Sequence, residues 1–163
     1  MQKGATLWRF PTRMSRWFPI GTSRLRILAR RLGQRGEETA REFLEDAGYE
    51  ILCRNWRAPR NLGELDIVCR DDAGTLCIVE VKTRRWRKAE EPMPHPVFAV
   101  NPEKRRRLRR AVSAYLGALG NPAIPLRYDA IEVWANAQGQ PVMLRHWPDL
   151  FAGISRYSLQ NFH

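Results

Sequence analysis

The sequence has few cysteines, no long apolar run and, in its first part, no acidic residue. Its cysteines, Cys53, Cys69 and Cys77, are odd in number and lack CxxC spacing, which argues against a disulfide framework. We expect buried, reduced thiols, as is typical of a cytoplasmic protein. The three histidines show no metal-ligand spacing, which argues against zinc. No stretch is apolar and long enough for a signal peptide or a transmembrane segment, so we expect neither.

Charge is distributed unevenly along the 163 residues. Residues 1–35 contain nine Lys or Arg and no Asp or Glu, whereas residues 36–163 contain 19 basic and 17 acidic residues. This predicts a basic, flexible leader at 1–22 and one domain at 23–163. Such an arm suits a polyanion, either nucleic acid or an anionic membrane surface. Because Trp8 and Trp17 lie among the arginines, a membrane-surface protein remains a third, weaker alternative.

Hydrophobic periodicity and turn residues predict two helices and five strands. The helices are expected at about 24–47 and from Pro102, after a capping Asn101, to just before Gly120. Strands are expected at 49–54, 64–70, 75–82, 126–134 and 141–147, and irregular segments at 55–62 and 84–100. The order helix, three strands, helix, two strands predicts an α/β or α+β sheet with helices packed against it.

The predicted hairpin at 63–84, GELDIVCRDDAGTLCIVEVKTR, carries charges in strands that should bury apolar side chains. Since side chains alternate along a strand, Glu80 and Lys82 share one face, and Glu64 shares a face with Asp66. If Asp66 and Glu80 face the same side, two carboxylates and one ammonium converge. Carboxylates buried together are costly unless a cation compensates, and Mg²⁺ prefers such oxygen ligands. A surface ion pair between Glu80 and Lys82 is the plainer alternative.

GELD followed by IVEVKTR resembles the PD-(D/E)XK nuclease signature, with Glu-Leu in place of the leading proline. The segments RRLGQRGEETAREFLEDAGYEILCRNWR, NPEKRRRLRRAVSAYL and RYDAIEV surround it. In this order the four segments resemble the YraN-like family of small bacterial proteins over about 100 residues. Two segments depart from the family pattern, APRN before GELD and RKAEEPMPHP after KTR.

The resemblance implies an α/β fold with a restriction-endonuclease-like core, a central mixed β-sheet flanked by helices, akin to archaeal Holliday-junction resolvases. It implies a Mg²⁺-dependent endonuclease, with Mn²⁺ as substitute, that hydrolyses phosphodiester bonds in DNA, which is favoured over RNA. Branched or damaged DNA is the candidate substrate, and a homodimer would suit a junction-cutting relative. The implied metal ligands are Glu37, Asp66, Glu80 and the backbone carbonyl of Val81, and Lys82 completes the catalytic set with the three carboxylates.

The segment KRRRLRR at 104–110 predicts a basic helix face that contacts phosphates, because no acidic residue interleaves after Glu103. A solvated helix face is the alternative. No base-reading pattern is visible, so specificity for structure over sequence is expected. The candidate nucleic-acid-binding residues, including two that follow the hairpin, are Arg84, Arg85, Lys104, Arg105, Arg106, Arg107 and Arg110.

Two further acidic residues are candidates for a supporting role beside the metal, Glu64 and Asp129. Asp129 alternates with apolar Ile131 and Val133, which predicts an inward side chain that braces Arg127 or the first helix. A non-catalytic nucleic-acid-binding protein of the same fold remains the alternative function. Such a protein would gain nothing from clustered carboxylates that repel phosphate.

Overall fold

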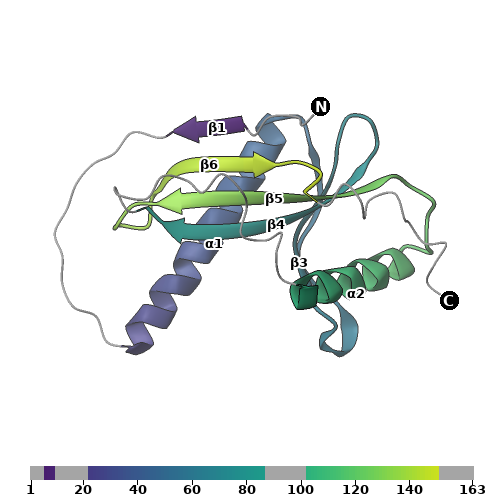
Figure 1. The fold of residues 1–163 in the computed structure, drawn as a ribbon, viewed down its shortest axis with the longest axis horizontal. Coiled ribbons are helices and arrows are strands. Elements are labelled where there is room, and N and C mark those ends of the chain that lie inside the picture. Colours follow the sequence, from purple (N-terminus) through teal and green to yellow (C-terminus); the bar gives the residue numbers. More distant parts are fainter. Residues whose placement is uncertain (1–5, 10–21, 87–101, 151–163) are drawn as a thin grey trace.

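The computed structural model describes residues 6–9, 22–86 and 102–150, which form one sheet with two helices (Figure 1). The six strands lie in the order β1-β6-β5-β4-β3-β2. In chain order the elements are β1 (Thr6–Arg9), α1 (Thr22–Asp46), β2 (Glu50–Arg57), the 3₁₀ turn η1 (Pro59–Asn61), β3 (Glu64–Arg70), β4 (Leu76–Arg85), α2 (Pro102–Ala118), β5 (Leu126–Ala135) and β6 (Pro141–Trp147).

The sheet is mixed. Strands β4 and β5 are parallel, and each of the other neighbouring pairs is antiparallel. Parallel neighbours need a long crossover, because the chain must return to the starting edge of the sheet. Helix α2 lies within this crossover. The predicted α/β core, a central mixed sheet flanked by helices, is therefore confirmed.

The two helices cover opposite faces of the sheet. Along β4, Cys77 and Val79 pack in one buried cluster with residues of α1, whereas Leu76 and Ile78 pack in another with residues of α2. This follows from the period-two alternation of a strand that is buried on both faces. In Figure 1, α1 crosses the strands and α2 lies beside β3. Over the described residues, neither helix is long and apolar enough to span a membrane.

The observed elements follow the predicted ranges closely, with three differences. Strand β2 continues to Arg57, where the sequence predicts a loop, although Asn55 has a positive φ of 49°. Strand β4 continues to Arg85, and the rest of the predicted irregular segment, 87–100, lies outside the described residues together with Asn101. Strand β1 lies within the range predicted as a leader and pairs with β6, and no pattern in the sequence predicts it.

A buried polar network ties β5 and β6 together. The Asp129 carboxylate, fully buried, accepts hydrogen bonds from Arg127 Nε at 3.1 Å and from the backbone N of Asp149 at 2.9 Å. It also lies 3.0 Å from Nε2 of His146. Burial favours a raised pKa for Asp129, yet His146 and Arg127 outweigh it and hold that pKa below its usual value. The prediction that Asp129 points inward and braces Arg127 is confirmed.

Helix α1 crosses β4 at very close range at Gly36. A Cβ on Gly36 would lie 1.9 Å from Thr83 Oγ1, 3.0 Å from Thr83 Cβ and 3.1 Å from Thr83 Cγ2. A β-branched residue has little rotamer freedom with which to withdraw, so the helix itself would have to move. The absent side chain at Gly36 thus sets the distance between α1 and the sheet, and with it the position of the next residue, Glu37.

We predict that Gly36→Ala destabilises the protein by about 1–3 kcal/mol, the usual cost of overpacking a tight contact. The matched control is Gly33→Ala on the same helix, where an added Cβ meets no atom within 4 Å. That substitution should stabilise the protein by up to about 1 kcal/mol, because alanine favours helix over glycine. Urea denaturation of both variants measures this. Equal effects of the same sign would contradict the close-contact explanation.

Candidate functional site

The candidate site begins where β3 and β4 part. Their antiparallel pairing runs from Arg70 opposite Leu76 to Ile67 opposite Val79, and Asp66 and Glu80 are the next residues on the two strands. The Asp66 carboxylate enters this opening, where its Oδ2 accepts a hydrogen bond of 2.8 Å from the backbone N of Val81. The bond fixes the orientation of the Asp66 carboxylate against β4.

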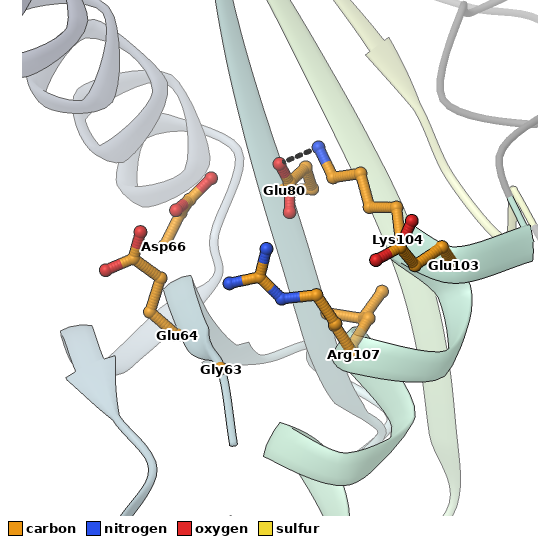
Figure 2. A pocket seen from close by; sticks show the side chains of 8 residues that line it. Gly63, Glu64, Asp66, Glu80, Glu103, Lys104 and Arg107 are labelled. Carbon is orange, nitrogen blue, oxygen red and sulfur yellow. Dashed lines mark hydrogen bonds and ion pairs between the residues drawn. The ribbon is translucent and has the colours of Figure 1, made fainter. Parts of the chain in front are cut away.

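Asp66 and Glu80 line a pocket of about 410 Å³ between the sheet and α2. Figure 2 shows its two walls, with Glu64 and Asp66 of β3 and Glu80 of β4 facing Lys104 and Arg107 of α2. The carboxylates and the cations thus come from different elements and meet across the cavity. The complete lining is Gly63, Glu64, Asp66, Glu80, Glu103, Lys104, Arg107 and Leu108.

One ion pair crosses the pocket. Nζ of Lys104 donates to Oε1 of Glu80, and the dashed line in Figure 2 marks this contact. The Glu80 side chain is 21% exposed and that of Lys104 is 42% exposed. At this exposure the pair is partly screened by water, so its contribution to stability is modest. Its importance lies in its partner, because Glu80 is one of the two carboxylates that line the pocket.

Asp66 is held in an unfavourable state for a carboxylate. Burial raises the pKa of Asp66 to about 7, and the negative charges of Glu80 and Glu37 act in the same direction. The Val81 N–H and the Lys104 ammonium oppose this shift without cancelling it. A nearby positive charge is therefore what the Asp66 carboxylate lacks, and such a perturbed group in a pocket is typical of a functional site.

The chemistry of these donors fits a hard divalent cation. Within the described ranges 6–9, 22–86 and 102–150, no three His, Cys, Asp or Glu side chains form a metal-binding group. At the pocket, Asp66 and Glu80 form a pair whose charges interact. Mg²⁺ is commonly held by one or two carboxylates, while water and substrate phosphate complete its octahedron. A pair of carboxylates beside an open cavity is sufficient for that mode of binding.

The other predicted ligands and the predicted lysine lie around this pair rather than in the pocket. Glu37, on α1, is near enough to raise the pKa of Asp66 but does not line the cavity. Val81 adjoins Glu80, and its N–H binds Asp66. Lys82 is exposed and is two residues beyond Glu80 on β4, outside the pocket lining. Glu64 lines the pocket, with Arg57 Nε at 3.7 Å from its carboxylate.

The predicted nucleic-acid-binding residues divide into three groups. Lys104 and Arg107 face the pocket. Arg84 donates to the buried Glu132 at 3.3 Å, so it is engaged within the sheet. The remaining residues lie on the surface, where Arg85, Arg106 and Arg110 are exposed and Arg105 is partly buried.

Two features of the site were not predicted. The sequence suggests Lys104 as a phosphate contact, whereas the structure pairs it with Glu80. Glu103 also lines the pocket, although its place in the first turn of α2 suggests only a helix-capping role. The one available signal was the position of both residues at the start of the helix that crosses over between β4 and β5.

Comparison with known proteins agrees with the motif. Residues 36–133 match the model of uncharacterised protein family UPF0102. A UPF0102 protein of Symbiobacterium thermophilum is 42% identical over 113 residues, which cover 69% of this chain and 90% of that protein. One of Chlorobium phaeobacteroides is 45% identical over 105 residues, covering 64% and 78% respectively.

Among solved structures, Pyrococcus furiosus SfsA in complex with Ca²⁺ aligns with 15% identity and a TM-score of 0.29. The alignment covers 73% of this chain and 62% of that one. At this TM-score the likeness carries no argument about fold or function. The sequence relatives and the family model are therefore the comparisons that bear on this chain.

We predict that Asp66→Asn stabilises the metal-free protein at neutral pH. A carboxyl group with a higher pKa in the folded state contributes full stability only below its unfolded pKa and loses that contribution as the pH rises to about 7. Each unit by which the pKa is raised corresponds to about 1.4 kcal/mol. An asparagine keeps an oxygen for the Val81 N–H and carries no charge. The advantage of the variant should therefore grow between pH 4 and pH 7.

Urea denaturation at several pH values, with a chelator present, measures this difference. The matched control is Asp72→Asn in the exposed turn of the same hairpin, which should keep the pH profile of the wild type. If the free energy of unfolding changes with pH in the same way for Asp66→Asn and wild type, the raised pKa of Asp66 is contradicted.

Proposed function

This chain belongs to the UPF0102 family, the YraN-like group of the restriction-endonuclease-like superfamily, and we propose that it is a metal-dependent endonuclease. The reaction is hydrolysis of phosphodiester bonds in DNA, with Mg²⁺ as the metal and Mn²⁺ as a substitute. DNA is favoured over RNA, and branched or damaged DNA is the preferred substrate, because no base-reading pattern accompanies the basic surface.

One observation carries this proposal, the convergence of Asp66 and Glu80 in a pocket opposite the cations of α2. A protein that only needs a stable fold gains from apolar residues at such positions, since burial raises the pKa of Asp66 to about 7. A nuclease needs this arrangement, because the carboxylates bind the metal while Lys104 and Arg107 attract the phosphate.

The chemistry that a divalent ion would supply at this site is activation of a water molecule and neutralisation of charge on the phosphate. Asp66 and Glu80 would hold such an ion, and the Val81 N–H fixes the orientation of the Asp66 carboxylate. The Val81 carbonyl and Glu37 are further candidate ligands. Lys82, on the same face of β4 as Glu80, assists the attacking water with its ammonium group. Arg107 binds a non-bridging oxygen of the phosphate from the α2 side of the pocket.

The basic face of α2 extends the substrate surface beyond the pocket. Arg106 and Arg110 are exposed, one turn apart on the helix whose other face packs on the sheet. Cations in this position would bind the backbone of a nucleic acid whose scissile phosphate lies at Asp66 and Glu80. Binding of this kind depends strongly on salt.

A non-catalytic nucleic-acid-binding protein of the same fold is the second candidate function. It is favoured by the contact of Lys104 with Glu80, which neutralises one carboxylate without a metal, and by the lack of a three-ligand group in the described segments. Cleavage activity separates the two candidates, because a binder requires no metal and cuts no substrate.

We predict that the purified protein cleaves DNA in the presence of Mg²⁺ or Mn²⁺ and that EDTA abolishes the reaction. Asp66→Asn, Glu80→Gln and Lys82→Met should each lower the rate by about 100-fold or more, because each loss removes several kcal/mol of transition-state stabilisation. The assay compares branched, nicked and single-stranded DNA. Glu50→Gln, which alters an exposed carboxylate paired with Arg70, is the control and should cleave as the wild type does. Undiminished cleavage by the first three variants would reject the assigned site.

We also predict that Arg106→Gln and Arg110→Gln weaken DNA binding and flatten its salt dependence. Each lost phosphate contact should reduce the slope of log K against log salt by about 0.9 on duplex DNA. Fluorescence anisotropy in EDTA, across a salt series, measures both quantities without cleavage. Arg70→Gln removes the same charge at the other end of β3 and should leave the slope within error. An equal loss for all three variants would indicate general charge attraction instead of contacts with α2.

A further inference from the structure

The ammonium of Lys104 is bound to a carboxylate oxygen of Glu80 that the proposed metal ion would need as a ligand. Glu80 has two neighbours of opposite charge, the partly buried carboxylate of Asp66 and the ammonium of Lys104. Figure 2 shows the ammonium at Oε1 of Glu80, on the side of that carboxylate nearest α2, with Asp66 on its other side. A divalent ion bound between Asp66 and Glu80 would meet this ammonium at short range, and like charges repel at such distances.

The Lys104 side chain can leave Glu80 without a rearrangement of the fold. It is 42% exposed, its backbone belongs to the first turn of α2, and its stem is a flexible chain of four carbons. The ammonium can therefore move into solvent or deeper into the cavity without a shift of the helix. Glu80 has a shorter side chain, and its backbone is fixed by the pairing of β4 with β5, so the longer Lys104 side chain is the one expected to move.

We propose that Lys104 is a built-in competitor for the metal ion. In the metal-free protein its ammonium holds Glu80, and the incoming ion must displace it. This inference rests on the proposed metal site and adds a regulation to it. The affinity for metal is set lower than the two carboxylates alone would give, so that the site fills only when the metal can replace an existing ion pair.

The test is Mn²⁺ binding, measured by isothermal titration calorimetry on the full chain without nucleic acid. Lys104→Met should tighten binding by about tenfold, since a hydrogen bond between charged groups contributes about 1.5 kcal/mol or more, and 1.4 kcal/mol corresponds to tenfold. Lys104→Arg keeps the charge and should bind close to the wild-type affinity. Glu80→Gln and Asp66→Asn should lose measurable binding.

Arg106→Met is the matched control, because it removes the same charge from the exposed side of the same helix. It reports how much any lost cation on α2 favours metal binding at a distance. Tightening by Lys104→Met that clearly exceeds this control supports the competition. Equal tightening in the two variants overturns it, while Mn²⁺ binding that depends on Asp66 and Glu80 leaves the metal site intact.

Two other outcomes have distinct meanings. If Lys104→Met lowers thermal stability without a change in Mn²⁺ affinity, the ion pair only anchors α2 and the competition is refuted. If neither the wild type nor Lys104→Met binds Mn²⁺, both the competition and the proposed metal site fall. Circular dichroism of each variant accompanies the titrations, and Lys104→Gln provides a second neutral side chain should the methionine variant fold poorly.

Discussion

The parting of β3 and β4 beyond Ile67 and Val79 is the constraint on which the site depends. An antiparallel pair that ends inside a sheet leaves backbone groups in need of partners, and Asp66 supplies one by accepting from Val81. The same opening brings a second carboxylate, Glu80, beside the first. The end of strand pairing therefore also brings two negative charges together. Lys104 of α2 offsets part of their repulsion by its contact with Glu80.

A comparison of Asp129 with Asp66 separates a structural carboxylate from a candidate functional one in this fold. Asp129 is buried and Asp66 is partly buried, and their pKa values move in opposite directions. Asp129 is satisfied by His146 and Arg127, so its negative charge is stabilised where it stands. Asp66 faces a second carboxylate and has one backbone donor. The Asp129 carboxylate is stabilised by its partners, whereas the Asp66 carboxylate at the cavity is not. Such a contrast indicates that Asp66 is placed for function at a cost in stability.

The sequence was sufficient to predict five of the six strands, both helices and the Asp66 and Glu80 pair, because these follow from local periodicity and from a short hairpin. Contacts between elements that are far apart in the sequence could not be predicted. Lys104 is 24 residues from Glu80, and no local pattern states which side chain of α2 enters the pocket. Strand β2 was predicted too short, since Asn55 with its positive φ interrupts the pattern without ending the strand.

The glycine of the GELD motif now has a physical role that is separate from metal binding. Gly63 has a φ of 147°, and a Cβ there would lie 3.1 Å from both the Ala111 Cβ and the Arg107 carbonyl oxygen. Helix α2 therefore rests directly on the backbone that leads into β3. Because Lys104 and Arg107 belong to this helix, the close approach at Gly63 fixes how far the two cations stand from the carboxylates. The motif therefore contributes to both sides of the pocket. Asp66 supplies a carboxylate, and Gly63 lets α2 approach closely enough to bring its cations opposite.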